Sequence, residues 1–548
     1  MNRKEIVGST IGGTYSSGVL IKLKGISHEK IEVGYSLIAK GKTCNYLMIV
    51  NDVIAGSSET AEALDLSRKP TSAKDLLSGS LLTSRVNCIP IASNTAAGPE
   101  DALTIPDYLS ECSLLSREEA ETFYGCCDLQ EKYPLGTIKP TDFIIPIDVE
   151  ILVQNSFGIF GKSGTGKSVL GNLIAAYLVT YSNHIRLEKK DNIPPTLLIF
   201  DMHSEYGLKL RTPSQKTLAS GVAQIFPEEF TVYCLDPSLV EQIEKEFRRG
   251  ALAKELKVKK ENIEVEDIVV LSELLKIPGA ASLNLQAVRS RLEKLAGTWF
   301  EALLNFESFE PKTLRELDFE QQVVTSLKAF SRRLSPFKNF PQLSEAEDTC
   351  QQLIKDLMSN KNVVISFGKY GDFEILYMFI VNYISRRLRE EYVSRSIFEE
   401  TTNRIVIFVE EAHKFLNPSV RESSPLGLIA RELRKRGIVL CVVDQTPSQI
   451  DENVFGMIWN FFVGATNIDR DIEVSTRAIR FPELFKPLVA SMRRQEFLVY
   501  GSAVSFPSVV KVVDYASQME DLRQRYRNEF SRDTEKLSKS LDRILDRD

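Results

Sequence analysis

Apolar and polar residues alternate from residue 1 to about residue 55, in runs such as VGSTIGGTYSSGVLIKLKG and KIEVGYSLIAKG. Frequent glycines divide the alternation into short pieces. A period of two indicates strands with one buried and one exposed face, and glycines between them are typical of tight turns. The pattern predicts a small antiparallel β-barrel or sandwich at the start of the chain.

A different pattern begins at Phe157, where short and continuous apolar runs recur. They predict strands over 157–160, 196–201, 230–236, 362–367, 404–411, 437–445 and 461–466. Runs without alternation suit strands that are buried on both faces, as in a parallel sheet covered by helices. The run SVLGNLIAAYLVTY predicts a helix that opens at Ser168. The expected fold class is therefore α/β with a mostly parallel sheet.

Two charged stretches have helical spacing instead. Between Asp236 and about Asn360, segments such as LQAVRSRLEKLAGTWFEALL predict a helical bundle inserted between two strands of the sheet. The last 35 residues or so predict a charged helix that is either solvated or docked on a neighbouring subunit or partner. Its thin apolar stripe consists of Leu522, Tyr526, Phe530, Leu537, Leu541 and Leu545.

These patterns divide the chain into five parts. We expect a β-barrel and connecting segment (1–140), a first core part (141–235), the helical insertion (236–361), a second core part (362–514) and a C-terminal charged helix (515–548).

Composition narrows the class of protein. Of the 548 residues, 43% are hydrophobic and 26% charged, as in ordinary globular proteins. No apolar run has the length of a membrane span, and MNRKEIVGST lacks the apolar segment of a signal peptide, so we expect a cytoplasmic protein without membrane contact. The scattered cysteines and histidines predict neither a zinc site nor a disulfide framework.

The segment GKSGTGKS, residues 161–168, has the spacing of a phosphate-binding loop between a strand and a helix. Backbone N–H groups and the positive end of the helix dipole attract phosphates. Lys167 is expected to contact the β- and γ-phosphates, and the Ser168 hydroxyl to bind Mg²⁺. The expected ATP-binding residues are Gly161, Lys162, Ser163, Gly164, Thr165, Gly166, Lys167, Ser168 and Val169.

A second motif, RIVIFVEEAH, places Glu410 and Glu411 at the carboxyl end of a strand. Ligands of open α/β sheets bind at this edge. We expect Glu410 to hold Mg²⁺ through a water molecule, and Glu411 to orient or deprotonate the attacking water.

Other strand ends carry further candidates. Asp201, a weaker Mg²⁺ candidate, and Glu205 follow one strand in IFDMHSEYG, and Gln445 follows another in VVDQ. We expect Glu205 to face the γ-phosphate or the water, and Gln445 to sense the γ-phosphate. The simpler alternative is that the acids only cap a helix.

The segment ARELRKRG concentrates basic side chains just before a buried strand. Stabilising the charge that develops on phosphate requires a cation, which in some ATPases comes from the adjacent subunit. Arg434 is the predicted trans-acting residue, with Arg431 and Arg436 as alternatives. A solvated basic turn would explain the same pattern.

Taken in order, GKSGTGKS, DMHSEYG, FVEEAHKF, ARELRKRGIVL and DQTPSQIDENVFGMIWNFFVGATN resemble the HerA/FtsK branch of RecA-like motor ATPases, and HerA most of all. The N-terminal alternating segment is similar to the HAS-barrel of that family, and RRQEFLVYGSAVSFPSVVKV to its closing strands. Leu433 departs from the family, which commonly has glycine there, and Glu410 replaces the aspartate of many P-loop ATPases.

The resemblance implies an ATP-dependent double-stranded DNA translocase or helicase that works as a homo-hexamer, with DNA in its central pore. It also implies a partner nuclease, or a sirtuin-like or other effector of anti-phage defence. An overall charge of −6 is compatible with this, because a ring can concentrate positive charge in its bore. The candidate sources of that charge are Arg248, Arg249, Lys257–Lys260, Arg493 and Arg494.

Two other functions remain open. The ring is either a motor or a scaffold that assembles an effector enzyme, with ATP binding as the switch. A polypeptide or conjugation motor of the same superfamily is the third reading, although such motors often carry membrane segments.

Overall fold

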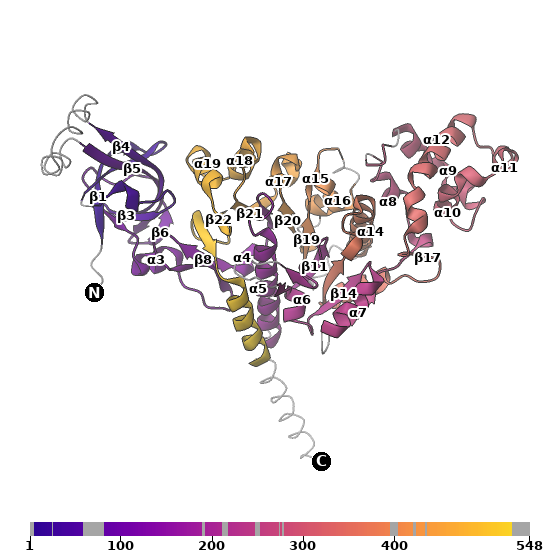
Figure 1. Ribbon diagram of the computed structural model, residues 1–548, viewed down its shortest axis with the longest axis horizontal. Coiled ribbons are helices and arrows are strands. Elements are labelled where there is room, and N and C mark those ends of the chain that lie inside the picture. The colour runs from indigo at the N-terminus through magenta and orange to yellow at the C-terminus, as the bar shows by residue number, and fades with distance from the viewer. Residues whose placement is uncertain are drawn as a thin grey trace, which may run out of the picture.

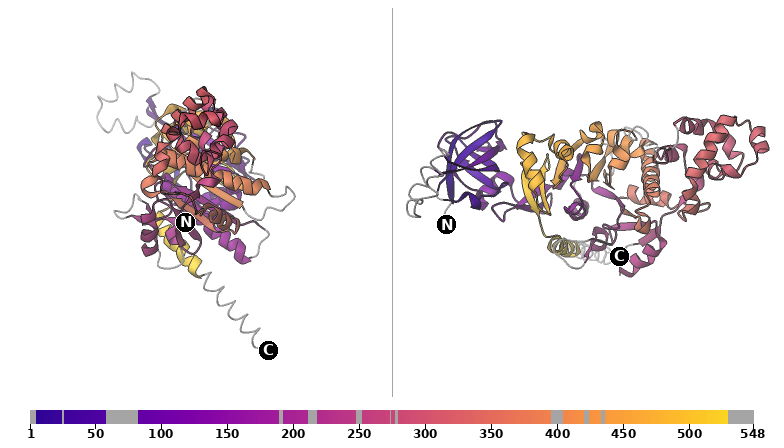
Figure 2. Two further views of the ribbon diagram at one scale, coloured as in Figure 1. Left: turned by 90° about the vertical axis from the view of Figure 1, so that its right-hand side faces the viewer. Right: turned by 45° about the horizontal axis from the view of Figure 1, so that its top comes forward.

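The computed structural model describes residues 5–24, 26–57, 82–188, 192–210, 218–246, 252–272, 274–276, 279–394, 404–419, 424–432 and 436–528. Three bodies follow one another along the long axis in Figure 1, with the N-terminal strands at one end, the large sheet in the middle and a group of helices at the other end. The turned view in Figure 2 shows the same separation.

The N-terminal body is a closed antiparallel barrel. The strand order is β2-β1-β7-β3-β4-β5-β6, and an additional pairing of β2 with β5 closes it. Alternate side chains, among them Val19, Ile21 and Met48, are buried inside, as the sequence pattern predicts. The strands are β1 (Ile6–Thr14), β2 (Gly18–Leu23), β3 (Ser36–Lys40), β4 (Asn45–Ser57), β5 (Leu82–Thr95), β6 (Gly98–Asp101) and β7 (Glu111–Leu114).

The central body is a 12-stranded sheet in the order β15-β14-β18-β11-β19-β20-β10-β21-β22-β23-β8-β9. Neighbours from β15 to β21 run parallel, and those from β21 to β9 antiparallel. The parallel strands are β10 (Ser156–Phe160), β11 (Pro195–Asp201), β14 (Phe230–Cys234), β15 (Leu252–Glu255), β18 (Asn362–Ser366), β19 (Arg404–Glu410), β20 (Ile438–Asp444) and β21 (Ile458–Gly464). The antiparallel strands are β22 (Glu496–Tyr500), β23 (Ser508–Val512), β8 (Lys132–Ile138) and β9 (Ile144–Asp148).

Helices cover both faces of this sheet. The crossover from β10 to β11 through α5 (Lys167–Glu188) runs in one direction along the strand order, and the crossovers through α14 (Glu374–Ser394) and α16 (Pro425–Glu432) run in the other. Because such crossovers are right-handed, α5 lies on the opposite face from α14 and α16. Buried strands between two helical layers explain the continuous apolar runs in the sequence.

The insertion between β14 and β18 is mainly helical, as expected. Its principal helices are α8 (Val265–Val269), α9 (Gly279–Glu293), α10 (Trp299–Leu304), α11 (Pro311–Glu316), α12 (Gln321–Arg333) and α13 (Cys350–Met358). It also contains β15, which extends the sheet beside β14, and a short pair of β16 (Val258–Lys259) with β17 (Leu343–Ser344). No sequence pattern predicts β15, because LAKE is short and its residues favour helix.

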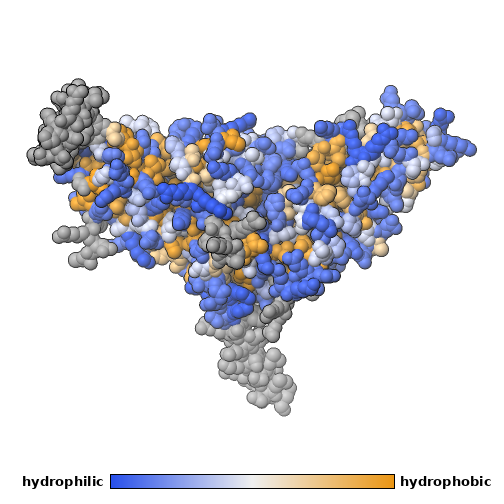
Figure 3. Space-filling view, viewed as in Figure 1, coloured by the Kyte–Doolittle hydropathy of each residue, from blue (hydrophilic) through white to orange (hydrophobic). Residues whose placement is uncertain are grey.

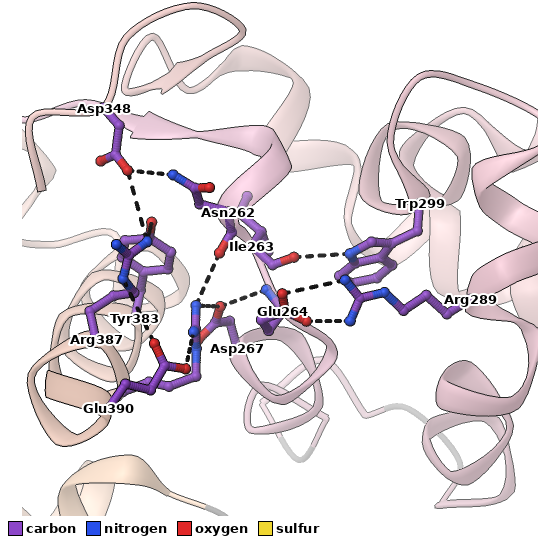
Figure 4. Close-up of polar contacts among 11 residues, drawn as sticks. Asn262, Ile263, Glu264, Asp267, Arg289, Trp299, Asp348, Tyr383, Arg387 and Glu390 are labelled. Atoms are coloured by element: carbon purple, nitrogen blue, oxygen red, sulfur yellow. Dashed lines mark hydrogen bonds and ion pairs between the residues drawn. The ribbon is translucent and has the colours of Figure 1, made fainter. Parts of the chain in front are cut away.

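Polar contacts attach the insertion to α14 (Figure 4). Arg386 on α14 donates to Asp267 Oδ2 at 2.7 Å and to the carbonyl of Asn262 at 3.0 Å. The Asn262 amide in turn donates to Asp348, and the Trp299 indole donates to the carbonyl of Ile263 at 2.9 Å. Since Asp267 is fully buried, this attachment is part of the packed interior.

The remaining helices complete the molecule. These are α3 (Arg117–Tyr124), α4 (Val149–Leu152), α6 (Val222–Ile225), α7 (Pro237–Glu246), α15 (His413–Leu416), α17 (Glu452–Phe455), α18 (Asp469–Thr476) and α19 (Pro482–Ser491). A final helix covers 515–528. Its apolar stripe packs on the chain itself, since Leu522 and Tyr526 are buried and the Tyr526 hydroxyl donates to Glu229 at 2.9 Å. Phe530 and the leucines that follow lie outside the described residues.

Most of the surface in Figure 3 is hydrophilic, with hydrophobic residues gathered over the barrel and below the centre of the molecule. Large exposed apolar side chains on the barrel are Ile6, Leu103, Tyr108 and Leu109. Among the described helices, none combines the length and apolar character of a membrane span.

Candidate active site

The segment 161–168 forms a loop between β10 and α5, as its spacing predicts. Gly161, Gly164 and Gly166 have φ values of +140°, +80° and +106°, which side chains other than glycine rarely adopt. Space is restricted as well, because a Cβ on Gly161 would lie 3.1 Å from Thr165 Oγ1. The loop therefore needs its glycines for conformation, and an anion can be bound by those of its backbone N–H groups that do not donate to carbonyls of the chain.

Neighbouring strand ends hold this loop in place. The N–H of Gly161 donates to the carbonyl of Asp444 on β20 at 3.3 Å, and the N–H of Lys162 donates to the carbonyl of Ala465 after β21 at 3.0 Å. The Lys162 side chain donates to Asn467 at 3.2 Å. At the start of α5, Val169 is buried and Ser168 is partly exposed.

Lys167 points back over the loop. Its Nζ donates to the carbonyls of Gly161 at 2.6 Å and Lys162 at 3.2 Å. Burial lowers the pKa of Lys167, and nearby negative charges oppose this effect. Those charges belong to Glu411, Asp444, Glu410 and Glu205. The loop lysine and the acids of three strand ends are thus brought to one place.

Glu410 ends β19 and is almost completely buried. Burial raises its pKa well above the usual range, and the charges of Asp201, Glu205 and Glu411 raise it further. Its Oε2 atom has no hydrogen-bond partner among the described residues. An unpaired carboxyl oxygen in an apolar site is costly unless a ligand or ion satisfies it.

Glu411, the next residue, has a left-handed backbone with φ +48°. Such strain in a residue other than glycine is most often found at functional sites. The turn directs its carboxylate toward Gln445, whose Nε2 donates to Oε1 at 2.6 Å. Glu411 and Gln445 are far apart in the sequence, and the parallel pairing of β19 with β20 brings them together.

A pair that the sequence reading did not identify lies beside them. The backbone N–H of His413 donates to Asp444 Oδ2 at 2.7 Å, and its Nδ1 lies 3.0 Å from the same oxygen. Burial opposes protonation of His413, but the hydrogen bond and charge of Asp444 raise its pKa overall. Burial likewise acts to raise the pKa of Asp444, but His413 lowers it overall. In the sequence, His413 follows the predicted Glu411 in FVEEAH, and Asp444 directly precedes the predicted Gln445 in VVDQ. This closeness to predicted site residues is the sequence feature that could have identified the pair.

Asp201 requires a correction. The expectation of a Mg²⁺ ligand does not fit its geometry, because backbone N–H groups of Glu205, Tyr206 and Gly207 donate to its two oxygens at 2.7 to 3.1 Å. Burial raises its pKa to about 7 against the effect of these bonds. Asp201 therefore closes the turn that carries Glu205, and no helix follows it within 202–210 for the acids to cap.

The predicted trans-acting arginine, Arg434, lies outside the described residues. Of its alternatives, Arg431 donates to the carbonyl of Gly427 in its own helix at 3.3 Å. Arg436 donates to the carbonyl of Tyr392 on α14 at 2.6 Å. Both described alternatives therefore have partners within their own chain.

The described candidates for DNA-binding cations do not form a single basic patch. Lys257, Lys259 and Lys260 form ion pairs with glutamates of the insertion. Arg493 lies 3.6 Å from Glu32 of the barrel, while Arg248 and Arg249 lie outside the described residues.

Residues 133–388 match the family model of the central domain of helicase HerA. Over 413 residues the chain is 23% identical to the DNA double-strand break repair helicase HerA of Pyrococcus furiosus, covering 68% of this chain and 67% of that protein. It is 20% identical over 518 residues to the protein of the same name from Sulfolobus acidocaldarius, covering 93% and 94%. Among solved structures, VirB4 of Thermoanaerobacter pseudethanolicus aligns over 70% of this chain and 97% of its own, with 13% identity and a TM-score of 0.46.

The family match spans the phosphate-binding loop, and the relatives extend over the strand that carries the paired glutamates. The central part of the chain therefore matches the HerA central domain, and the chain is similar to HerA helicases over most of its length.

Proposed function

We propose that this protein is an ATP-driven translocase or helicase that acts on double-stranded DNA. The observation that carries the proposal is the gathering of Glu410, Glu411 and Asp444 around Lys167, at the edge where the P-loop begins. Relatives named as DNA double-strand break repair helicases, one of them aligned over 93% of this chain, support the choice of substrate.

The residues of the site divide the work of hydrolysis. Lys167 and the loop N–H groups without a carbonyl partner bind the phosphates. The Ser168 hydroxyl with the unpaired Oε2 of Glu410 fits a magnesium ion with its water shell. Mg²⁺ bound there would add positive charge against the β- and γ-phosphate oxygens. Glu411 then orients the attacking water, and Gln445 holds the Glu411 carboxylate in place.

We further propose a homo-hexameric ring with ATP between protomers and DNA in the pore. In this arrangement a neighbouring subunit supplies the missing cation, for which Arg434 is the candidate. A nuclease or a defence effector is the expected partner, since a duplex motor alone modifies no strand. Contacts in the pore are expected to reach phosphates and not base edges.

The test is the ATPase rate of the purified protein with and without linear duplex DNA. We expect DNA to stimulate hydrolysis, and Glu411→Gln to abolish it while ATP still binds. Lys167→Ala is expected to lose ATP binding itself. Glu316→Gln, on the surface of the insertion, is the matched control and should keep the full rate.

The scaffold alternative gives a different outcome. If Glu411→Gln abolished ATP hydrolysis but left the activity of the partner effector intact, ATP would act only as an assembly switch. The salt dependence of duplex binding is a second readout. A motor that holds phosphates should show a log–log slope of about −0.9 for each phosphate contacted, whereas a scaffold needs no such dependence.

A further inference from the structure

The turn before β22 lies beside the P-loop, although it is more than 300 residues away in sequence. β22 runs antiparallel to β21, with Phe497 opposite Gly464. The start of β22 therefore lies at the same edge as the carboxyl ends of the parallel strands. Residues 492–495, which connect α19 to β22, form this turn.

Gln495 makes the contact with the loop. Its backbone N–H donates to the carbonyl of Thr165 at 2.8 Å, and its carbonyl accepts from Val512 at 3.0 Å. A Cβ on Gly166 would lie only 3.3 Å from Cγ of Gln495. The Gln495 side chain is thus pressed against the second glycine of the P-loop, next to Lys167 and Ser168.

The backbone of Gln495 is strained, with φ +64°. Its partly exposed side chain forms no hydrogen bond with any described residue. Glycine or asparagine would occupy this conformation at lower cost. A long amide at such a position, with its donor and acceptor available, is suited to contacting a ligand.

The opposite side of the P-loop carries the carboxylates. The strand order places β20 and β19 on one side of β10, and β21 and β22 on the other. Glu410, Glu411 and Asp444 belong to the first side, and Gln495 to the second. Since the γ-phosphate must face the carboxylates, the nucleoside end of a bound nucleotide extends toward the Gln495 side.

We propose that Gln495 binds the nucleoside part of ATP through hydrogen bonds to the ribose or the base. The inference rests on the proposed ATPase function and adds a specificity residue to that site. Gln495 takes no part in phosphate binding, which belongs to the loop itself.

Contacts with the barrel hold the turn in position. The N–H of Arg493 donates to Glu496 at 2.9 Å, and Glu496 pairs with Lys139 at 3.0 Å. Both Arg493 and Lys139 also lie within 3.6 Å of Glu32 on the barrel. A turn fixed from both sides presents Gln495 in one place, which reduces the entropy cost of binding.

The experiment compares two ligands that share phosphates but differ in the nucleoside. ATP and inorganic tripolyphosphate each compete with a fluorescent ATP analogue on the full-length protein. The variant is Gln495→Gly, because glycine removes the amide and still adopts the left-handed backbone. Gln524→Ala, whose amide lies on the surface of the C-terminal helix, is the matched control.

We expect Gln495→Gly to weaken ATP binding by about 3- to 10-fold, the usual contribution of a neutral hydrogen bond. Tripolyphosphate binding should not change. Equal weakening of both ligands would overturn the inference and make Gln495 a support of the loop, and unchanged ATP binding would overturn it directly. If the unmodified protein bound neither ligand, the ATPase proposal would fail instead.

Discussion

Glu410 and Glu411 are adjacent in the chain, but their carboxyl groups lie in different surroundings. Glu410 is buried, with one oxygen unpaired and its pKa raised by burial. Glu411 is on a left-handed turn and accepts a hydrogen bond from Gln445. Environments that separate two neighbouring carboxyl groups allow one to serve a metal and the other to serve water. The assignment of Mg²⁺ to Glu410 and of the attacking water to Glu411 stays a prediction.

The bond between Gln445 and Glu411 leads to the first prediction. Gln445→Ala should lower kcat by roughly 10- to 100-fold, because a hydrogen bond to a charged group contributes about 1.5–3 kcal/mol. The KM for ATP should change little, since the loop holds the phosphates. Steady-state ATPase assays measure both. Gln449→Ala is the control, because Gln449 is exposed and lies only four residues away.

A double-mutant comparison separates this role from a general loss of structure. In the Glu411→Gln background, adding Gln445→Ala should have almost no further effect, because the two residues act through one interaction. If the two substitutions lowered kcat independently, so that their fold-losses multiplied in the double variant, Gln445 would act on the nucleotide without Glu411.

The His413–Asp444 pair predicts a dependence of stability on pH. The pKa of His413 in the folded protein is raised above 6.5. Its protonated form therefore stabilises the fold fully below about pH 6.5, and the contribution disappears as pH rises through the folded-state pKa. The lowered pKa of Asp444 keeps its own contribution present at neutral pH, and that contribution is lost only in acid.

His413→Gln should accordingly lower the free energy of unfolding more at pH 6 than at pH 9, measured by urea titration. His203→Gln, at an exposed position, is the control and should change the free energy of unfolding by the same small amount at pH 6 and pH 9. If the loss of stability in His413→Gln did not depend on pH, the packing of the His413 side chain, and not its charge, would stabilise the fold.

The P-loop was predictable as a loop between a strand and a helix, because the spacing of its glycines indicates that conformation. The chemical roles of its single residues stay predictions. What the sequence could not show was pairing across strands. Asp444 lies beside His413 only because β19 and β20 are neighbours, and Asp201 is taken up by its own turn because three N–H groups converge there. Gln495 was missed because a single glutamine before a strand carries no pattern.

Helix α14 connects the active site with the insertion. Near its start, the Tyr377 hydroxyl donates to the carbonyl of Glu410 at 2.8 Å. Farther along, Arg386 binds Asp267 of the insertion, and near its end the carbonyl of Tyr392 accepts from Arg436. One rigid element thus contacts the carboxylate strand, the insertion and the arginine segment.

The buried Arg386–Asp267 pair gives a prediction at this scale. Arg386→Met should lower the free energy of unfolding by about 3–5 kcal/mol, because it leaves a buried carboxylate without its cation. Arg332→Met is the matched control, since its pair with Glu307 is exposed and such pairs contribute about 0–1 kcal/mol. Denaturant unfolding measures both variants. Similar small losses would mean that Asp267 does not depend on Arg386.

Strands of the core were predictable one by one from their continuous apolar runs, and α5 from its position after the loop. The order of the strands in the sheet was not predictable, because the sequence of a parallel strand does not indicate which strand lies beside it. The sequence pattern did not predict the edge strand β15, because its half-buried residues, Lys254 and Glu255, are rare in strands. The packing of the C-terminal helix against Phe226 and Glu229 was likewise not predictable from the sequence.

At the scale of the molecule, the barrel is joined to the core near the nucleotide site. Besides the cluster around Lys139, Arg480 of the core donates to the carbonyl of Ile91 on the barrel at 3.1 Å. Its guanidinium also lies over the ring of Tyr15 at 5.9 Å. The barrel itself was predictable from alternation, whereas these contacts join distant residues, 389 positions apart for Arg480 and Ile91. A partner that bound the barrel would therefore act close to the P-loop.

We propose that a complete site also requires a neighbour. Within one chain, Lys167 is surrounded by acids. Of the described arginines, Arg431 donates within its own helix and Arg436 donates to α14. A ring places the same surfaces of successive subunits against one another, so each site receives a group from the next protomer. Arg434 is the residue that we expect to cross the interface.

Mixing two inactive variants tests this arrangement. Arg434→Ala subunits retain Glu411, and Glu411→Gln subunits retain Arg434, so an interface between one of each kind has both groups in the correct orientation. With equal random mixing, about a quarter of the interfaces in a ring are complete. ATPase activity should therefore reappear on mixing, although Arg434→Ala alone loses on the order of 10³-fold in rate. Mixtures that stay inactive, while Arg436→Ala complements Glu411→Gln, would move the role to Arg436. If no arginine variant complemented it, the site would be complete within a single chain, because only a group supplied by a neighbour can be restored by a neighbour.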